Sequence, residues 1–198
     1  MPPQLWLVRH AETEWSASGR HTSHTEVSLT DAGREAARAL RTALARERFA
    51  LVLVSPRARA RETAELAGFP DAEEDENLAE WDYGELEGLT TAEIRARGGE
   101  WSSWTIWTGP VPGGETIEQV AARASAVLAR VDLAQGDVLC FGHGHMSRVL
   151  AAVALGLTPG AGRHLALDPG TINVIGHEHE WRALRLWNFR PSPFPFRQ

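Results

Sequence analysis

The stretch LWLVRHAETEW, residues 5–15, joins a short apolar run to an Arg-His pair. The apolar residues 5–8 are too few for a helix and are rich in strand formers, which predicts a buried strand. Such a strand delivers Arg9 and His10 to one edge of a sheet, and in open α/β sheets this edge is where ligands bind. Taken alone, however, an Arg-His pair is more often a solvated arginine beside a strand-end histidine. The rest of the chain has to decide between these interpretations.

Length and composition are typical of an ordinary globular protein, with 198 residues of which 43% are hydrophobic. We predict one domain over residues 1–190, followed by a Pro-rich tail at residues 191–198. No window approaches the ~20 consecutive apolar residues of a membrane span. The amino terminus lacks a signal-peptide pattern, so we expect a cytoplasmic location. Cys140 is the only cysteine, which excludes an intramolecular disulfide.

The charged residues narrow the classes of ligand. The net charge is −6 and no basic block occurs, which argues against nucleic acid as the main partner. All twenty basic residues are arginine, so Schiff-base chemistry and a P-loop lysine are excluded. Arginine binds phosphate through bidentate hydrogen bonds, which leaves phosphate chemistry open. The sequence leaves the oligomeric state undetermined, and a homodimer is compatible with it.

Segments typical of strands and helices alternate along the chain. The predicted strands are residues 5–8, 50–55 and 137–143, with two closing strands in TINVIGH and WRALRLWNF. The predicted helices begin at Thr30, after Pro56, near Thr116 and near His145. Residues 16–28 are expected to form a polar loop and the acidic residues 71–76 a solvated surface segment. This alternation predicts the α/β class, as a three-layer α/β/α sandwich around a mainly parallel sheet.

Three of the predicted strands end in polar residues of catalytic types. The first ends at Arg9 and His10, the second leads into Ser55 and several arginines, and the third ends at His143. Parallel strands would bring these side chains to one crevice. Two histidines with two arginines match an anionic substrate such as a small phosphomonoester.

The motifs around these strand ends resemble those of the histidine phosphatase superfamily, which includes phosphoglycerate mutases and many small phosphatases. RHAETEW resembles the RHG signature, SLTDAG resembles LTxxG, and SPRARARETA resembles SxxxRAxxTA. LAEWDYGELEG resembles LxExxxGxxEG, PGGET resembles PGGES, and FGHGH resembles SHG. The motifs keep the order of the family over roughly residues 5–150. The chain is most similar to the small broad-specificity phosphatases, and the resemblance implies a phosphoglycerate mutase-like fold.

The resemblance also implies a mechanism that needs no metal and no cofactor. His10 would attack phosphorus as a neutral imidazole, whose pKa nearby guanidinium groups lower, and become phosphohistidine. Arg9, Arg59 and His143 would hold the phosphate oxygens, whereas Arg57 and Arg61 would be neighbours of the site. Glu80 occupies the general-acid position. The further predicted binding residues are Ser16, Thr22, Ser23, Tyr83 and Gly144.

Two positions depart from the family pattern. Ala11 replaces the usual glycine after the first histidine, and its methyl group is expected to be tolerated at negative φ but can tighten the floor of the pocket. Ser16 stands where the mutases commonly have Asn, and its hydroxyl can still donate a hydrogen bond to phosphate.

Other functions were weighed against phosphate ester hydrolysis. His143 and His145, or the HEHE run at residues 177–180, could suggest a metal, but no further cluster has ligand spacing. The segment 98–122 contains no arginine, so it offers no cation for the second anion of a mutase substrate. Hydrolysis is therefore favoured over a mutase reaction. Tryptophans in this segment are more often core residues, although they weakly suggest apolar leaving groups. A catalytically silent phospho-ligand-binding module is the third alternative, and the complete catalytic set argues against it.

Overall fold

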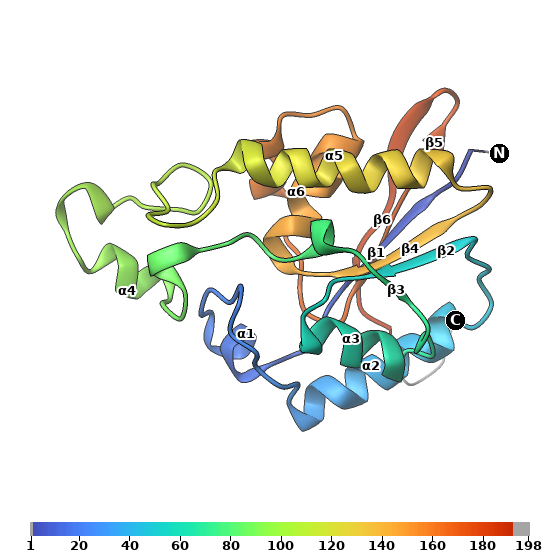
Figure 1. The fold of residues 1–198 in the computed structure, drawn as a ribbon, viewed down its shortest axis with the longest axis horizontal. Helices are drawn as coiled ribbons and strands as arrows, with labels where there is room; N and C mark the ends of the chain where they lie inside the picture. Colours follow the sequence, from blue (N-terminus) through green and yellow to red (C-terminus); the bar gives the residue numbers. More distant parts are fainter. Residues whose placement is uncertain (1, 192–198) are drawn as a thin grey trace, which may run out of the picture.

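A mixed six-stranded sheet forms the centre of the structure, a computed structural model that describes residues 2–191. Residues 192–198 of the expected Pro-rich tail therefore lie outside the described part of the chain. The strand order is β3-β2-β4-β1-β5-β6 (Figure 1). The strands are β1 (Leu5–Arg9), β2 (Leu51–Val54), β3 (Glu73–Glu74), β4 (Val138–Gly142), β5 (Ile172–Glu178) and β6 (Trp181–Phe189).

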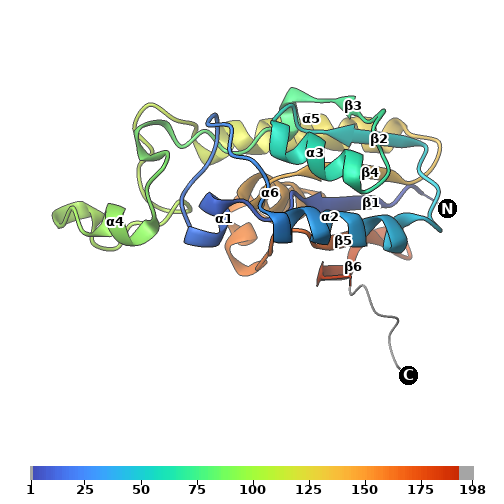
Figure 2. The same ribbon diagram turned by 90° about the horizontal axis from the view of Figure 1, so that it is seen from below.

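Helices cover both faces of this sheet, as Figures 1 and 2 show. The helices are α1 (Glu14–Ser18), α2 (Asp31–Leu44), α3 (Ala58–Leu66), α4 (Thr91–Arg95), α5 (Ile117–Leu133) and α6 (Gly144–Ala154). Helices α5 and α6 pack on one face, and α2 and α3 pack on the other. The three-layer α/β/α sandwich predicted from the sequence is confirmed.

The central strand β4 shows why the chain forms three layers. All five of its residues are buried, and successive side chains of a strand point to opposite faces. Val138 and Cys140 accordingly join the core beneath α5 and α6, whereas Leu139 and Phe141 join the core beneath α2 and α3. A strand buried on both faces therefore reads as a continuous apolar run.

The strand directions bring the predicted catalytic residues to one edge. Strands β1 and β2 both pair in parallel with β4, and β3 pairs in parallel with β2. The last two strands differ, because β5 runs antiparallel to β1, and β6 antiparallel to β5. The sheet is thus mainly parallel, as expected. The segments that carry α1 and α4 extend beyond the edge where β1, β2 and β4 end (Figure 1).

Two local expectations are wrong. The acidic residues 71–76 do not form a uniformly solvated segment, because β3 pairs with β2 and Asp75 is only 6% exposed. Asp75 accepts hydrogen bonds from the amide of Asn77 and from Arg130, and this pairing compensates the burial of its charge. The predicted polar loop, residues 16–28, begins inside the short helix α1, which Thr13 and Ser16 start with a reciprocal capping box. Among residues 2–191, no helix has both the length and the apolar character needed to cross a membrane.

Candidate active site

His10 lies directly after β1 and is 5% exposed. Its Nδ1 lies 2.8 Å from the carbonyl oxygen of Ala11. Because a carbonyl oxygen can only accept, Nδ1 carries the proton and Nε2 keeps a free lone pair. Burial lowers the pKa of His10 well below its usual value, and the charges of Arg9 and Arg59 lower it further. The imidazole is therefore neutral, and its Nε2 is unprotonated.

His143 faces His10 from the end of the neighbouring parallel strand. Arg9 is the register partner of Gly142, so the residues that follow these two, His10 and His143, leave the sheet side by side. Their ring centroids are 5.2 Å apart. Burial lowers the pKa of His143 well below its usual value, followed by the charge of Arg59. Both histidines are thus held neutral at the edge of the sheet.

Ser55, at the end of β2, fixes the tautomer of His143. Its Oγ lies 2.7 Å from Nε2 of His143 and also accepts the amide of Arg57 at 3.4 Å. Since the hydroxyl already accepts from that amide, its own proton is available for Nε2. Nδ1 of His143 then carries a proton, and this buried atom has no protein partner among the described residues.

Two buried arginines complete this group. Arg59 on α3 is fully buried, and its Nη atoms donate to the carbonyl oxygens of Thr22, Ser23 and Thr25 at 3.1 Å. Arg9 donates from Nη1 to the carbonyl oxygen of Leu167. Burial is the largest cause that lowers the pKa of both guanidinium groups. These bonds fix the orientation of both arginines.

Unpaired N–H groups distinguish this site from the rest of the protein. Within residues 2–191, four buried side-chain nitrogens lack a hydrogen-bond partner: Nε of Arg9, Arg57 and Arg59, and Nδ1 of His143. Buried donors are normally paired in native proteins. Three of the four belong to the residues predicted to hold phosphate, and we refer to Arg9, His10, Arg59 and His143 together as the phosphate floor. The floor offers N–H donors that an anionic oxygen would satisfy.

Glu80 lies beside the phosphate floor at the amino terminus of α6. Its Oε1 accepts hydrogen bonds from the amides of Trp81 (2.9 Å) and Met146 (2.8 Å), and its Oε2 accepts one from His145 (3.1 Å). A carboxylate interacts favourably with the amino end of a helix dipole. The three amides hold the carboxyl group in one orientation, 8% exposed and on the wall of the same pocket as His10.

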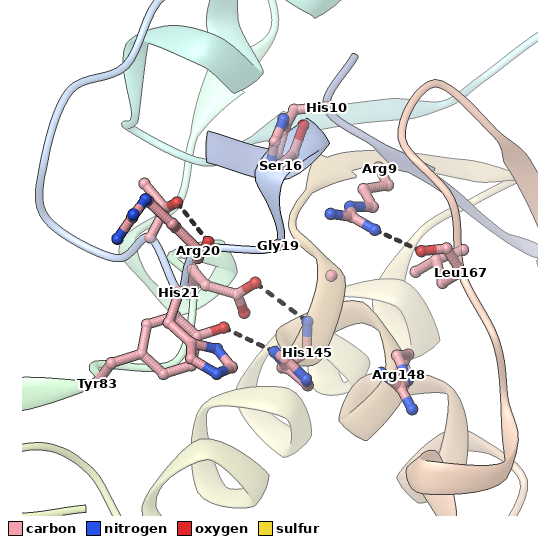
Figure 3. A pocket seen from close by; sticks show the side chains of 13 residues that line it. Arg9, His10, Ser16, Gly19, Arg20, His21, Tyr83, His145, Arg148 and Leu167 are labelled. Carbon is pink, nitrogen blue, oxygen red and sulfur yellow. Dashed lines mark hydrogen bonds between the residues drawn. The ribbon is translucent and has the colours of Figure 1, made fainter. Parts of the chain in front are cut away.

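The pocket above these residues contains most of the predicted binding residues (Figure 3). It is lined by Arg9, His10, Ser16, Gly19, Arg20, His21, Thr22, Glu80, Tyr83, Gly144, His145, Arg148 and Leu167. Arg59 and His143 do not line it, because both are completely buried behind this surface. Ser23 does not line it either. Its hydroxyl and amide both donate to Glu87 at 3.0 Å, so Ser23 fixes its loop.

The hydroxyl groups predicted to bind phosphate are already engaged with the protein. Ser16 donates to the carbonyl oxygen of Thr13 and accepts its amide, and Thr22 donates to the carbonyl oxygen of Arg20. The methyl group of Ala11 does not tighten the pocket, since it packs with Leu29 and Ala37 in a small core cluster. The φ angle of Ala11 is not positive, as expected for a tolerated alanine.

Sequence reasoning missed much of the outer part of the pocket. We refer to Arg20, His21, Tyr83, His145 and Arg148 together as the outer chamber. Of these, only Tyr83 is among the predicted binding residues, and His145 was named as a possible metal ligand. The expected apolar leaving-group site is wrong, because no tryptophan lines the pocket and Trp104 is only 2% exposed. Helical spacing was the available signal for Arg148, which lies four residues after Gly144 on α6.

Within residues 2–191, no group of three or more His, Cys, Asp or Glu side chains is arranged to hold a metal ion. His143 contacts Ser55, and His145 contacts the hydroxyl of Tyr83 at 2.7 Å. His177 and His179 lie at the far end of β5, away from the strand ends that carry the phosphate floor. The metal-independent mechanism remains a prediction for experiment.

Comparison with known proteins agrees with the site geometry. The family model of the histidine phosphatase superfamily (branch 1) matches residues 5–190. An acid phosphatase of Mycobacterium tuberculosis is 41% identical over 97% of this chain and 95% of its own length. A sedoheptulose 1,7-bisphosphatase of Saccharomyces cerevisiae is 34% identical over 79% of this chain and 69% of its own length. A 2,3-bisphosphoglycerate-dependent phosphoglycerate mutase of Methylobacterium is 36% identical over 78% of this chain and 81% of its own length.

Among solved structures, that of the Mycobacterium tuberculosis open reading frame Rv3214 superposes with a TM-score of 0.91 at 38% identity. The match covers 97% of this chain and all of the other chain. The agreement therefore extends over the sheet, both helical layers and the segments that surround the pocket. The chain belongs to the histidine phosphatase superfamily, branch 1.

Proposed function

We propose that this protein hydrolyses small phosphomonoesters through a phosphohistidine on His10, with broad specificity. The observation that carries the proposal is the set of unpaired N–H donors around His10, on Arg9, Arg59 and His143. A phosphoryl group in front of Nε2 of His10 would supply the missing acceptor oxygens. Phosphoryl transfer is mainly a matter of positioning and charge stabilisation, and a prearranged set of donors can provide both.

In the first step, Nε2 of His10 attacks phosphorus in line and the bond from phosphorus to the leaving oxygen breaks. Arg9, Arg59 and His143 stabilise the charge on the three equatorial oxygens. Glu80, in its protonated form, gives its proton to the leaving alkoxide, which departs as an alcohol. The bond from Nδ1 of His10 to the Ala11 carbonyl favours the positive charge that the ring acquires.

In the second step, a water molecule attacks the phosphohistidine. Glu80, now a carboxylate, takes a proton from this water as the new bond to phosphorus forms. The bond from phosphorus to Nε2 breaks, and its electron pair returns to the imidazole of His10. The products are the alcohol and inorganic phosphate, and the enzyme regains its starting state after phosphate leaves.

Hydrolysis is preferred over the mutase alternative because similar chains include an acid phosphatase and a bisphosphatase, and the acid phosphatase matches over almost the whole chain. The silent binding module is disfavoured because the nucleophile, the floor donors and Glu80 are all present. With 3-phosphoglycerate as substrate, we expect inorganic phosphate at least as fast as 2-phosphoglycerate. Fast isomer exchange with little phosphate release would support a mutase instead.

The proposal is tested by a screen of phosphomonoesters with the wild-type protein and His10→Ala, before and after dialysis against a strong chelator. We expect hydrolysis by the wild type at an unchanged rate after dialysis, and none by the variant. Circular dichroism should show that the variant keeps its fold. Retained turnover in His10→Ala would refute the assigned nucleophile. A loss restored by a divalent cation would refute the metal-independent mechanism.

A further inference from the structure

The backbone around Glu80 has no regular secondary structure, although most of it is buried. Residues 79–83 lie between two short 3₁₀ helices, Glu76–Leu78 and Gly84–Leu86, of which the first packs against α5 (Figure 1). Glu80 is 8% exposed and Trp81 is 1% exposed. Backbone groups in such a segment have no helical or sheet hydrogen bonds, so other groups must pair with them. The groups that hold this backbone also determine where the carboxyl group of Glu80 lies.

Arg123, on α5, binds the backbone on the amino-terminal side of Glu80. Its Nη1 donates to the carbonyl oxygens of Asn77 at 2.9 Å and Ala79 at 2.7 Å, and its Nη2 donates to that of Glu80 at 3.4 Å. Nη1 also lies 3.6 Å from Sδ of Met146, whose amide binds Oε1 of Glu80. Arg123 therefore contacts both the segment that carries Glu80 and the helix that binds its carboxyl group.

Glu115, in the PGGET motif, binds the backbone on the carboxyl-terminal side of Glu80. Its carbonyl oxygen accepts the indole N–H of Trp81 at 2.9 Å, and its Oε2 accepts the amide of Asp82 at 2.9 Å. The amide of Glu115 in turn donates to the carbonyl oxygen of Asp82 at 3.0 Å. A Cβ atom at Gly114 would lie 2.3 Å from that carbonyl oxygen, so a side chain there would force the two segments apart. The PGGET motif thus packs directly against the segment that carries Glu80.

An ion pair between Arg123 and Glu115 joins these two sets of contacts. Nε of Arg123 donates to Oε1 of Glu115 at 2.8 Å, and Nη2 donates to Oε2 at 2.7 Å. This two-pronged geometry fixes both planar groups relative to each other. The two side chains are only 19% and 21% exposed, so the pair is largely shielded from water. Together the two residues hold the backbone from residue 77 to residue 82, with Glu80 inside this range.

We propose that Arg123 and Glu115 are positioning residues for the general acid, which hold the backbone of Glu80 so that its carboxyl group meets the leaving oxygen. Neither residue lines the pocket that contains His10, so neither touches the reacting atoms. Proton transfer requires the donor and acceptor to lie within hydrogen-bond distance, and a displacement of about 1 Å can cost on the order of a hundredfold in rate. The inference rests on the proposed function, in which Glu80 protonates the leaving group.

The phosphate floor is held by other contacts. Its residues follow β1 and β4 or bind carbonyl oxygens outside residues 77–82. A displaced Glu80 should therefore slow protonation of the leaving group but leave the attack of His10 on phosphorus intact. This difference separates positioning of the acid from a general loss of structure.

The test measures kcat/KM for glycerol 1-phosphate, whose alkoxide needs the proton, and for nitrophenyl phosphate, whose leaving group departs almost without it. Arg123→Gln should lower kcat/KM about ten- to a hundredfold for glycerol 1-phosphate and less than threefold for nitrophenyl phosphate. Arg123→Lys should recover part of the loss, because it keeps the charge but not the planar geometry. Arg130→Gln is the matched control, since Arg130 also lies on α5 but pairs with Asp75 and Glu73. It should change neither value more than threefold.

A double variant shows whether Arg123 acts through Glu80. In the Glu80→Gln background the acidic proton is already absent, so Arg123→Gln should lower kcat/KM for glycerol 1-phosphate by less than a further threefold. A loss as large as in the wild-type background would overturn the positioning role. Equal losses on the two substrates in Arg123→Gln would overturn it as well.

Glu115→Gln breaks the same ion pair and keeps the shape of the side chain, so it replaces Arg123→Gln if circular dichroism shows that the latter does not fold. It should show the same selective loss on glycerol 1-phosphate, and equal losses on both substrates would overturn the proposal. No hydrolysis of either substrate by the wild type would instead refute the proposed function. Equal losses on both substrates in Glu80→Gln would refute Glu80 as the acid, and the positioning role with it.

Discussion

The phosphate floor and the outer chamber are neighbours, since Arg9 and His10 of the floor line the same pocket as the chamber, but different features of the chain build them. Two floor residues, His10 and His143, directly follow the paired strands β1 and β4, whose register fixes their separation. The outer chamber collects side chains from the loop after β1, from the segment after β3 and from α6. The floor is therefore a product of sheet geometry, whereas the chamber depends on how separate segments pack.

The largest effect is expected when the floor loses a cation. Arg59→Gln removes a fully buried guanidinium and should lower kcat about 10²–10⁴-fold on every phosphomonoester, whatever its leaving group. Arg61→Gln on the same helix is the control, since Arg61 is exposed and pairs with Glu74. A loss that depends strongly on the leaving group would mean that the two parts of the pocket are not separate in function.

Glu80 lies at the boundary between the floor and the chamber, and the effect of its substitution should depend on the chemistry of the leaving group. Glu80→Gln keeps the shape of the side chain but has no acidic proton to donate. An aliphatic alkoxide needs this proton in the transition state, whereas nitrophenolate departs almost without it. For kcat/KM, which reports the first step, we expect a loss on the order of 10²–10⁴-fold for alkyl phosphates and a far smaller loss for nitrophenyl phosphate. Equal losses in kcat/KM on both substrates would assign Glu80 to binding and not to protonation of the leaving group.

A smaller effect is expected for Ser55, which acts through His143. Ser55→Ala leaves Nε2 of His143 without its donor, so the proton can move from Nδ1 and the floor loses one phosphate contact. We expect a fall of about five- to fiftyfold in kcat, with a parallel weakening of inhibition by inorganic phosphate. Ser55→Thr keeps the hydroxyl and should restore part of kcat and part of the inhibition by inorganic phosphate. Ser147→Ala, at another buried serine, serves as the control. Unchanged phosphate inhibition in Ser55→Ala would contradict this positioning role.

The smallest effect concerns stability, to which both parts of the pocket contribute. The pKa values of His10, His143, His21 and His145 are all lowered by burial. Below the ordinary histidine pKa of about 6.5, the unfolded chain binds more protons than the folded chain. The free energy of unfolding therefore decreases as the pH is lowered. Each histidine contributes about 1.4 kcal/mol per pH unit in this window.

Urea unfolding at several pH values between 7 and 5 measures this contribution. Carboxylates also titrate in part of this range, so the informative quantity is the difference between the wild type and a variant. His21→Gln should reduce the slope of the free energy of unfolding against pH by about the contribution of one histidine, since the pKa of His21 is lowered to about 4. A slope identical to that of the wild type would show that His21 binds protons equally in the folded and the unfolded protein.

The sequence could predict that the floor residues lie close together because each of them belongs to a recognisable local pattern. Apolar runs end at Arg9 and at His143, and the register of parallel strands then brings the two ends together. The same reasoning could not predict the orientation of Arg148, which depends on the carbonyl oxygens of residues 162 and 163 and on the ring of Trp107. The tryptophans of segment 98–122 suggested an apolar leaving-group site, which the structure does not show. The reason is related, since composition does not tell which face of a segment meets the core.

The surroundings of individual polar side chains were equally hard to predict. Asp75 reads as one more residue of an acidic surface run, but β3 turns it inward to meet Arg130 on α5. The hydroxyls of Ser16 and Thr22 lie near the pocket as predicted, although the backbone already uses both. Sequence patterns located these side chains but could not assign their hydrogen-bond partners, which depend on the completed fold.

The central claim is that Nε2 of His10 carries the phosphoryl group between the two steps. The direct test is to mix the protein with a labelled phosphomonoester, quench within milliseconds and follow the phosphoprotein at different pH values. We predict a phosphoenzyme that is stable in alkali, labile in acid and assigned to His10 by mass spectrometry. It should be absent from His10→Ala and should accumulate in Glu80→Gln with nitrophenyl phosphate, because water attack is slowed. Phosphate release without a phosphoenzyme, or a phosphate on another residue, would contradict it.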